Sequence, residues 1–383
     1  MQKSSSVKKS PVDSILLILV LLLVFMGLLV LFSASEYNGR VRFHDSAYYF
    51  KKQLFATALG LGAMYAVSSV DYHIFIRLAP GAYLLSLILS TAVLLVGQEI
   101  NGSKRWLSLG PLSFQPSEFA KVAVILFLVW QIEKSRKRPR SFWFLCRTML
   151  SLLPVAGLVG SNNLSTAIII LGIGVILVFS SSPGYIQFVG PACAGVGFIG
   201  IFLAAESYRL ERLAIWRNPE KYEKGFQTIQ GLYAIGSGGL FGRGFGNGIQ
   251  KLGFVPEAQN DMIFSIICEE FGLTGAAFLI IVFGLLLWRL CVISLHSRDL
   301  AGALVSAGIM GHLAIQVILN IAVVTNTIPN TGITLPFFSY GGTSVMFLLG
   351  EIGLALNISR RKLLMILIVI RFQFPEGGFC IVA

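Results

Sequence analysis

Long apolar runs dominate this chain, and their lengths predict a bundle of membrane-spanning helices. A helix needs about 20 apolar residues to cross a bilayer. The candidate runs are Ser14–Phe32, Leu54–Val70, Ala79–Val96, Phe119–Ile132, Phe144–Val159, Leu164–Phe179, Ile186–Ala204, Met262–Leu287, Ala301–Val324 and Thr343–Asn357. We therefore expect an all-α polytopic membrane protein with about ten transmembrane helices. A long polar loop, 205–261, separates the seventh from the eighth.

Clusters of basic residues predict the orientation of the chain in the membrane. They lie at Lys3, Lys8, Lys9, 134–140 and 360–362. Short cytoplasmic loops carry an excess of Lys and Arg, and an even number of spans puts all these clusters on one side. Both termini are then cytoplasmic, and loop 205–261 faces outward. The expected segments are an N-terminal tail 1–13, a transmembrane domain 14–361 and a C-terminal tail 362–383.

Composition supports the membrane interpretation and excludes other classes. Hydrophobic residues make up 55% of the chain and charged residues 13%, which is too apolar for an ordinary soluble protein. The net charge of +12 is explained by cytoplasmic loops, so it does not indicate a nucleic-acid partner. The five cysteines show no metal-binding spacing and are expected to pack as small core residues.

Glu118 and Lys121 bring opposite charges into the fourth predicted span. They are three residues apart and share a helix face. One interpretation is a mutual ion pair, because an unpaired charge inside a membrane is costly. The other is that Lys121 lines an outward cavity and meets a lipid phosphate. In the preceding loop, Lys104 and Arg105 beside Trp106 either anchor the helix at the headgroups or hold a diphosphate.

The outward stretch Gly225–Gly272 is rich in glycine and ends in acids at the membrane edge. Its glycines resemble a nucleotide loop only superficially, since no strand precedes them and no GK[ST] follows, so we expect no nucleotide. Asp261 either completes the first turn of the eighth helix or acts as a general base on a hydroxyl. Glu257, with Arg243 and Lys251 expected nearby, favours the second interpretation.

Polar residues also mark the ninth span and the loop after it. Gln316 and Asn320 are four residues apart, with His312 one turn earlier, and such side chains usually bond between helices. The following loop mixes proline, glycine and hydroxyl residues, including Ser339. Irregular backbone at membrane depth lines a cavity or is buried in protein. This loop is therefore expected to form a second wall of the site.

Several blocks in order resemble the SEDS family (shape, elongation, division and sporulation), whose members include FtsW, RodA and SpoVE. The likeness extends from about Asp13 to Arg361. The blocks are Leu31–Ser35 (LFSAS), Asn101–Trp106 (NGSKRW), Phe114–Lys121 (FQPSEFAK), Gly225–Gln227 with Gly236–Gly242 (GFQ and GSGGLFG), Pro256–Asp261 (PEAQND) and Leu335–Gly342 (LPFFSYGG).

The resemblance implies a peptidoglycan glycosyltransferase in the bacterial cytoplasmic membrane that polymerises lipid II and releases undecaprenyl diphosphate. It places the essential aspartate of the family on Asp261, as a base or as a ligand of a divalent cation such as Mg²⁺ or Mn²⁺. Lys121 and Arg105 would face the diphosphate or support the cavity. Glu118, Glu257, Arg243, Lys251, Gln316 and Ser339 are the further candidate substrate-binding residues.

The chain departs from the family pattern at a few positions. Asn163 replaces an aspartate of the family, so no role that depends on charge transfers there. Asn260 and Met262 flank the expected catalytic acid in place of Thr and Phe. The segment Asp45–Gln53 resembles the FtsW and SpoVE branch, which implies cell division with a class B penicillin-binding protein as partner. RodA-like elongation remains an alternative.

Two other functions fit the same features. A lipid II flippase would also carry the intramembrane charges Glu118 and Lys121. Against transport, the polar residues cluster on the outward side and no inverted repeat is visible. The third alternative is a non-catalytic scaffold of the division complex.

Overall fold

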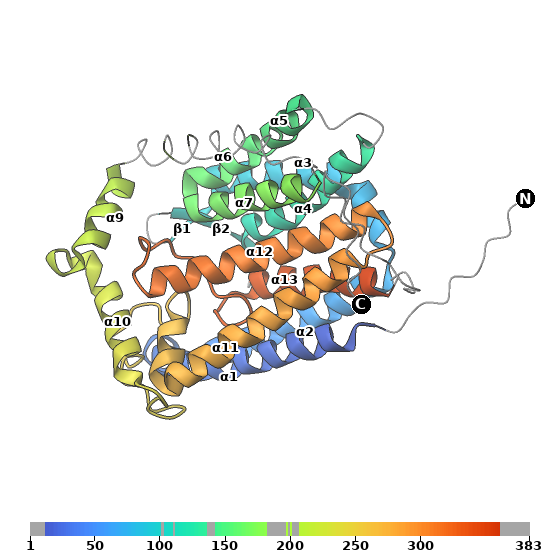
Figure 1. The fold of residues 1–383 in the computed structure, drawn as a ribbon. Helices are drawn as coiled ribbons and strands as arrows, with labels where there is room; N and C mark the ends of the chain where they lie inside the picture. The colour runs from blue at the N-terminus through green and yellow to red at the C-terminus, as the bar shows by residue number, and fades with distance from the viewer. Residues whose placement is uncertain are drawn as a thin grey trace, which may run out of the picture.

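The computed structural model describes residues 12–100, 103–109, 112–135, 142–181, 197, 200 and 207–360. The predicted seventh span at 186–204 and the tails 1–11 and 361–383 therefore lie outside the described residues, apart from two isolated glycines. The long helices are α1 (Ser14–Phe43), α2 (Tyr48–Ser69), α3 (Tyr72–Val96), α4 (Pro116–Lys134), α7 (Leu164–Ser181), α11 (Ile263–Leu295), α12 (Leu300–Val324) and α13 (Gly342–Ser359) (Figure 1). The shorter ones are α5 (Phe142–Leu150), α6 (Leu153–Asn162), α9 (Ser207–Arg217) and α10 (Phe226–Gly238).

Aspartates begin three of the long helices. Asp13, Asp71 and Asp299 are the N-caps of α1, α3 and α12, and each side chain accepts a hydrogen bond from a first-turn amide. Two of these caps also join helices. Asp13 forms a bidentate ion pair with Arg289 of α11, and Asp299 accepts from the Tyr72 hydroxyl of α3. The caps therefore tie the helix ends together on the side where α1 begins.

Close helix packing depends on small residues where α2 meets α13. A Cβ atom at Gly353 would lie 2.7 Å from the carbonyl oxygen of Met64, and one at Gly60 would lie 2.7 Å from Leu349. Membrane helices approach closely through such positions. On the opposite, outer surface of the bundle, large apolar side chains such as Phe25, Leu95 and Trp288 are exposed, as expected where helices face lipid.

The polytopic helical fold predicted from the apolar runs is confirmed. Within the described part, six helices are long and apolar enough to cross a membrane: α1, α3, α7, α11, α12 and α13. The fifth predicted span, Phe144–Val159, is wrong as a single helix, because α5 and α6 divide it at Ser151 and Leu152. Pro154 stands in the first turn of α6, where its missing N–H is tolerated, and it could not continue α5.

One end of the bundle carries structure that the apolar pattern did not predict. Strands β1 (Gln98–Ile100), β2 (Ser103–Leu109) and β3 (Leu112–Phe114) form a small antiparallel sheet between α3 and α4. In the sequence, Arg209, Arg212 and Arg217 alternate with apolar residues, which predicts a short amphipathic helix, and α9 occupies this stretch. Helix α10 was not expected in a glycine-rich segment. Figure 1 shows α9 and α10 lying across the end of the bundle that is opposite the start of α1.

Candidate active site

Asp261 lies at this end of the bundle, two residues before α11. Its Oδ1 atom accepts a long hydrogen bond of 3.5 Å from Gln227 Nε2 of α10. A Cβ atom at Gly332 would lie 3.9 Å from Asp261 Oδ2 and 3.8 Å from Arg105 Nη1. The carboxylate and the guanidinium therefore flank the same glycine. Three segments distant in sequence converge here: the β2 strand, α10 and the loop before α13.

The surroundings of Asp261 make it a stronger base than an ordinary aspartate. Burial raises its pKa to about 6, and the charge of Glu257 acts in the same direction. The positive charges of Arg105 and Arg212 oppose this shift. The side chain is only half-buried by its accessible surface, so the carboxylate remains within reach of a ligand. A base with a pKa near the working pH is favourable for proton abstraction.

This raised pKa makes a prediction about pH. An ionised Asp261 is the active form of a base, so kcat/KM should fall as the pH drops through about 6. Glu257→Gln removes a neighbouring negative charge and should move this midpoint to lower pH. Initial rates between pH 4.5 and 8 measure both midpoints. A wild-type midpoint that stays near 4, or a Glu257→Gln midpoint that rises, would contradict the assignment.

The backbone around Asp261 is held by α12 and by the loop that follows it. Asn320 Nδ2 donates to the carbonyl oxygens of Asp261 at 2.8 Å and Ile333 at 2.7 Å. Ser339 Oγ donates to Asn260 O at 2.6 Å, and Tyr340 N donates to Gln259 O at 2.8 Å. Ser339 was expected to bind substrate, but the structure shows its hydroxyl bonded to the main chain. It therefore fixes the shape of the acidic segment.

Arg105 is fixed on β2 by a hydrogen bond from its Nε to the carbonyl oxygen of Asn162, at the end of α6, at 3.2 Å. The next residue, Asn163, stands where the family has an aspartate. Its Oδ1 accepts from Thr166 N at 3.3 Å, as a helix cap does. The amide can therefore serve at the start of α7 without a charge.

Lys121 and Glu118 form the ion pair that their spacing suggested. Lys121 Nζ lies 3.0 Å from Glu118 Oε1 and donates to Gln316 Oε1 at 3.2 Å, and all three side chains are buried. Gln316 Nε2 in turn donates to Thr334 O at 3.1 Å. Lys121 is 1% exposed, so it does not line an open cavity in this structure.

The buried network continues from Gln316 to a second ionisable pair. His312 Nε2 lies 2.9 Å from Gln316 Oε1, and His312 Nδ1 lies 2.8 Å from Glu351 Oε2 of α13. His312 was expected to take part in packing or interhelical bonding, and it bonds between α12 and α13. Gln316 thus joins the loop at Thr334 to both ionisable pairs.

Arg243 and Lys251 were expected near Glu257, and the structure places them elsewhere. Lys251 pairs with Glu270 at 2.6 Å, and Arg243 approaches Glu269 at 3.9 Å, both well inside α11. Glu257 instead has a positive φ of 54°, accepts from Asn260 Nδ2 and faces Arg42 of α1 at 4.0 Å. The two cations therefore hold the loop on α11, and their expected position near Glu257 is wrong.

Two residues at the site were not singled out for it from the sequence. Gln227 belongs to the GFQ block, but no spacing rule linked it to Asp261. Arg212 appeared only as one charge of an amphipathic helix. Its Nη1 donates to Asn330 O at 3.2 Å, which brings it to the loop beside Asp261. Arg212 on α9 and Gln227 on α10 reach the site because these helices cross the end of the bundle. Recognising that arrangement in the sequence would have predicted both residues.

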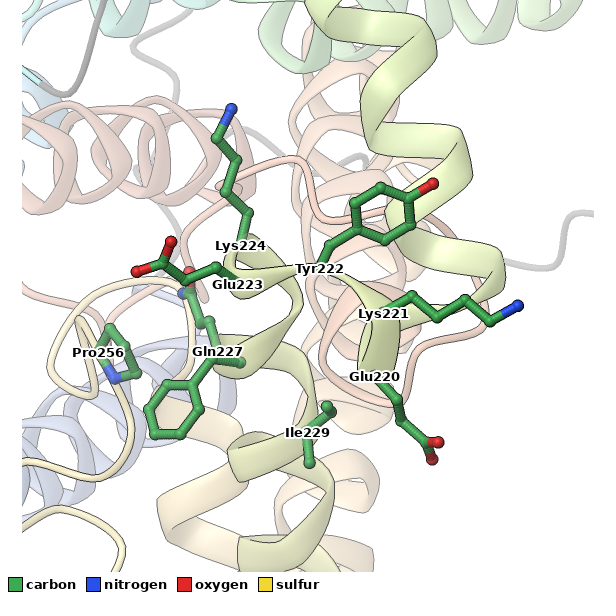
Figure 2. Close-up of a pocket in the computed structure, with 9 residues that line it drawn as sticks. Glu220, Lys221, Tyr222, Glu223, Lys224, Gln227, Ile229 and Pro256 are labelled. Atoms are coloured by element: carbon green, nitrogen blue, oxygen red, sulfur yellow. The ribbon is translucent and has the colours of Figure 1, made fainter.

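A wide cavity of about 730 Å³ opens beside this site. It lies between the start of α10, the two short 3-10 turns before it (Pro219–Lys221 and Glu223–Gly225) and Pro256. Its volume falls within the range of ligand-binding pockets. Figure 2 shows Glu223 and Gln227 pointing to the side of Pro256, while Lys221 and Tyr222 point away. Gln227 therefore belongs both to the cavity wall and to the contacts of Asp261.

Comparisons with known proteins show the family to which the chain belongs. The model of the FtsW/RodA/SpoVE family, described as "Cell cycle protein", matches residues 13–363. Stage V sporulation protein E of Bacillus subtilis (strain 168) is 38% identical, covering 92% of this chain and 98% of the relative. A probable peptidoglycan glycosyltransferase FtsW of Trichlorobacter lovleyi is 35% identical, covering 91% and 93%.

Solved structures of related proteins share this fold. A chain from "Structural coordination of polymerization and crosslinking by a peptidoglycan synthase complex" has a TM-score of 0.78 and 30% identity, covering 92% of this chain and 99% of that one. The rod shape determining protein RodA of Thermus thermophilus has a TM-score of 0.69 and 30% identity, covering 92% and 97%. The chain therefore belongs to the FtsW/RodA/SpoVE family of multi-pass membrane proteins.

Proposed function

We propose that this chain is a peptidoglycan glycosyltransferase that polymerises lipid II on the outer face of the bacterial cytoplasmic membrane, in cell division. The observation that carries the proposal is Asp261, whose carboxylate lies with Arg105 beside Gly332 and accepts a hydrogen bond from Gln227 of the cavity wall. Burial raises the pKa of this carboxylate to about 6. Relatives with 35% and 31% identity are named probable peptidoglycan glycosyltransferase FtsW. Both termini and the tails 1–13 and 362–383 are then cytoplasmic, and 205–261 is outside.

The chemistry assigned to Asp261 is general-base catalysis. The carboxylate removes the proton from an acceptor sugar hydroxyl as its oxygen attacks the anomeric carbon of the donor. The bond from that carbon to the diphosphate breaks, and undecaprenyl diphosphate leaves with the bonding electrons. Arg105 and Arg212 supply positive charge near Asp261, where the leaving diphosphate gains negative charge. Guanidinium groups suit phosphate because they offer paired donors.

The cavity beside Gln227 is assigned to the sugars of the growing strand. Its lining combines the aromatic residue Phe226 with the polar residues Glu223 and Gln227. Apolar surface with a few polar groups is the usual composition of a small-molecule site. The cavity lies on the outer side of the site and is open, which suits a product that lengthens at each step.

These residues would hold a divalent cation, Mg²⁺ or Mn²⁺, together with the phosphates of the substrate. Among the described residues, no group of three or more His, Cys, Asp or Glu side chains is placed to hold a metal. Mg²⁺ is often held by one or two carboxylates together with substrate phosphates. Asp261 would supply the protein ligand, and a bound cation would offset the negative charge of the diphosphate.

The proposed partner is a class B penicillin-binding protein that crosslinks the strands. A similar chain was solved within a peptidoglycan synthase complex, which supports a stable assembly with a partner. Lipid II is the proposed substrate, the membrane is the medium, and no nucleic acid is involved. The branch of the family, division rather than elongation, rests on the Asp45–Gln53 segment and on the FtsW and SpoVE relatives.

The function is tested with the purified protein and its partner in detergent, supplied with lipid II and Mg²⁺ or Mn²⁺. We expect glycan polymer, seen as a ladder on a gel and digested by a muramidase. Vesicles loaded with fluorescent lipid II test the rival function. Transfer of lipid II between leaflets without polymer under any condition would replace the proposal by a flippase, and neither activity would favour a scaffold.

A further inference from the structure

Helix α11 is broken near its outer end, and the glycine-rich loop fills the break. Gly272 has φ 67° and ψ −166°, so the helical hydrogen bonds stop there. The loop replaces them: Arg243 N and Gly244 N donate to the carbonyls of Glu269 and Glu270, and Leu273 N donates to Gly239 O. A broken membrane helix is tolerated where other protein groups satisfy its backbone. The loop is thus built into α11.

Two carboxylates stand at this break, and both are fully buried. Glu269 Oε1 accepts from Ile249 N at 2.8 Å and Gln250 N at 3.2 Å. Glu270 Oε1 accepts from Lys251 Nζ at 2.6 Å and from Ser33 Oγ of α1 at 2.6 Å. The side chain of Lys251 is 3% exposed, so this ion pair is closed off from water.

The ion pair closes the chain into a ring that contains Asp261. From Lys251 the backbone runs through the turn at Val255, whose amide donates to Gln250 O at 2.8 Å, to Asp261 and into α11. Helix α11 then leads to Glu270, which returns to Lys251. One part of this ring is helix α11, and the other part is the non-helical segment 252–261. Because the ion pair closes this ring, residues 252–261 have less conformational freedom than they would have in an open loop.

We propose that the buried Lys251–Glu270 pair, with Ser33, is a positioning device that sets how Asp261 approaches the acceptor hydroxyl. Lys251 and Glu270 do not touch the substrate; they act through the backbone of 252–261. Ser33 extends the device to α1, so three elements fix one segment. The inference rests on the proposed function, because it concerns the proton acceptor of that reaction.

Variants of Lys251 and Glu270 test whether the ion pair positions Asp261 or only balances a buried charge. Lys251→Met leaves Glu270 buried without a cation, and we expect lower thermal stability and a kcat at least about tenfold lower, since misplacement by 1 Å costs roughly a hundredfold. The double variant Lys251→Met/Glu270→Gln removes both charges and should regain thermal stability, but its kcat should stay low because the ring stays open. Lys251→Arg keeps the pair and should keep kcat. KM for lipid II should change little throughout.

A matched control comes from the exposed pair of Lys51 and Asp45, which lie 2.8 Å apart at the start of α2, outside the cavity. Lys51→Met removes one charge of an ion pair without opening a buried ring, and it should leave kcat unchanged. A double variant Lys251→Met/Glu270→Gln with wild-type kcat would overturn the inference. So would equal losses of kcat in Lys251→Arg and Lys251→Met.

A readout without turnover keeps the inference separate from the proposed function. Amide hydrogen exchange of residues 252–261, followed by mass spectrometry in detergent, should be faster in the double variant than in wild type and unchanged in Lys51→Met. If wild type makes no polymer, the proposed function fails and the exchange result alone decides the positioning role. Unchanged exchange in the double variant would overturn it.

Discussion

Replacing Asp261 by Asn is expected to reduce glycan polymerisation by about 10²- to 10⁴-fold, the usual contribution of a general base. The variant should remain folded, because the strongest contact of Asp261 uses its backbone: Asn320 donates to the carbonyl oxygen, which asparagine retains. An amide of the same shape can also stay beside Gln227. What it loses is the ability to accept a proton. Polymer yield from lipid II, measured over time with matched amounts of protein, gives the ratio.

A control acid lies elsewhere on the described surface. Asp45 pairs with Lys51 at 2.8 Å at the start of α2 and is exposed, so Asp45→Asn should leave polymerisation near the wild-type rate. Equal polymer from Asp261→Asn and wild type would remove Asp261 from the mechanism. Loss of polymer in both variants would instead point to a general effect of lost surface charge.

Replacing Lys121 by Met is expected to have the largest effect on stability. It leaves Glu118 buried in a membrane helix without its cation, and breaking a buried pair from one side costs about 3–5 kcal/mol. The same change deprives Gln316 Oε1 of one donor. We expect a clear drop in the midpoint of thermal unfolding in detergent. The double variant Glu118→Gln/Lys121→Met removes both charges and should recover most of that drop.

The matched comparison is Lys51→Met, which breaks an ion pair between two exposed side chains. Such pairs contribute about 0–1 kcal/mol, so its unfolding midpoint should stay close to that of wild type. If Lys121→Met unfolds like Lys51→Met, the buried network does not stabilise the bundle. If the double variant is no more stable than Lys121→Met, the cost lies in packing and not in the unpaired charge.

The apolar pattern predicted most of the fold because membrane helices are specified by length and composition. The spans expected at Leu164–Phe179 and Ala301–Val324 match α7 and α12 within two residues at each end. The pattern failed where local backbone chemistry overrides it. Pro154 divides one expected span into α5 and α6, and the sheet β1–β3 occupies a loop that carries no strand periodicity. Helix α10 was missed because its glycines read as a turn-rich loop.

The site was predicted in part, for a physical reason that Lys251 illustrates. Asp261, Arg105 and the loop after α12 do meet, since each belongs to an end of a helix or strand at one side of the bundle. Lys251 is six residues from Glu257 in sequence, yet its side chain turns back to Glu270. The break in α11 at Gly272 lets the glycine-rich loop bond to the helix, and this brings Lys251 to Glu270. Nothing in the spacing of charges shows that a helix will be broken.

Two of the buried ionisable pairs have different consequences for how the protein is made. Glu118 and Lys121 lie on one helix, so α4 can leave the translocation machinery already neutralised, before any later helix exists. His312 and Glu351 lie on α12 and α13, 39 residues apart, and neither can pair with the other until α13 has been synthesised. We therefore expect membrane insertion of α12 to be completed together with α13. Biogenesis of this chain should then be sensitive to truncation before α13.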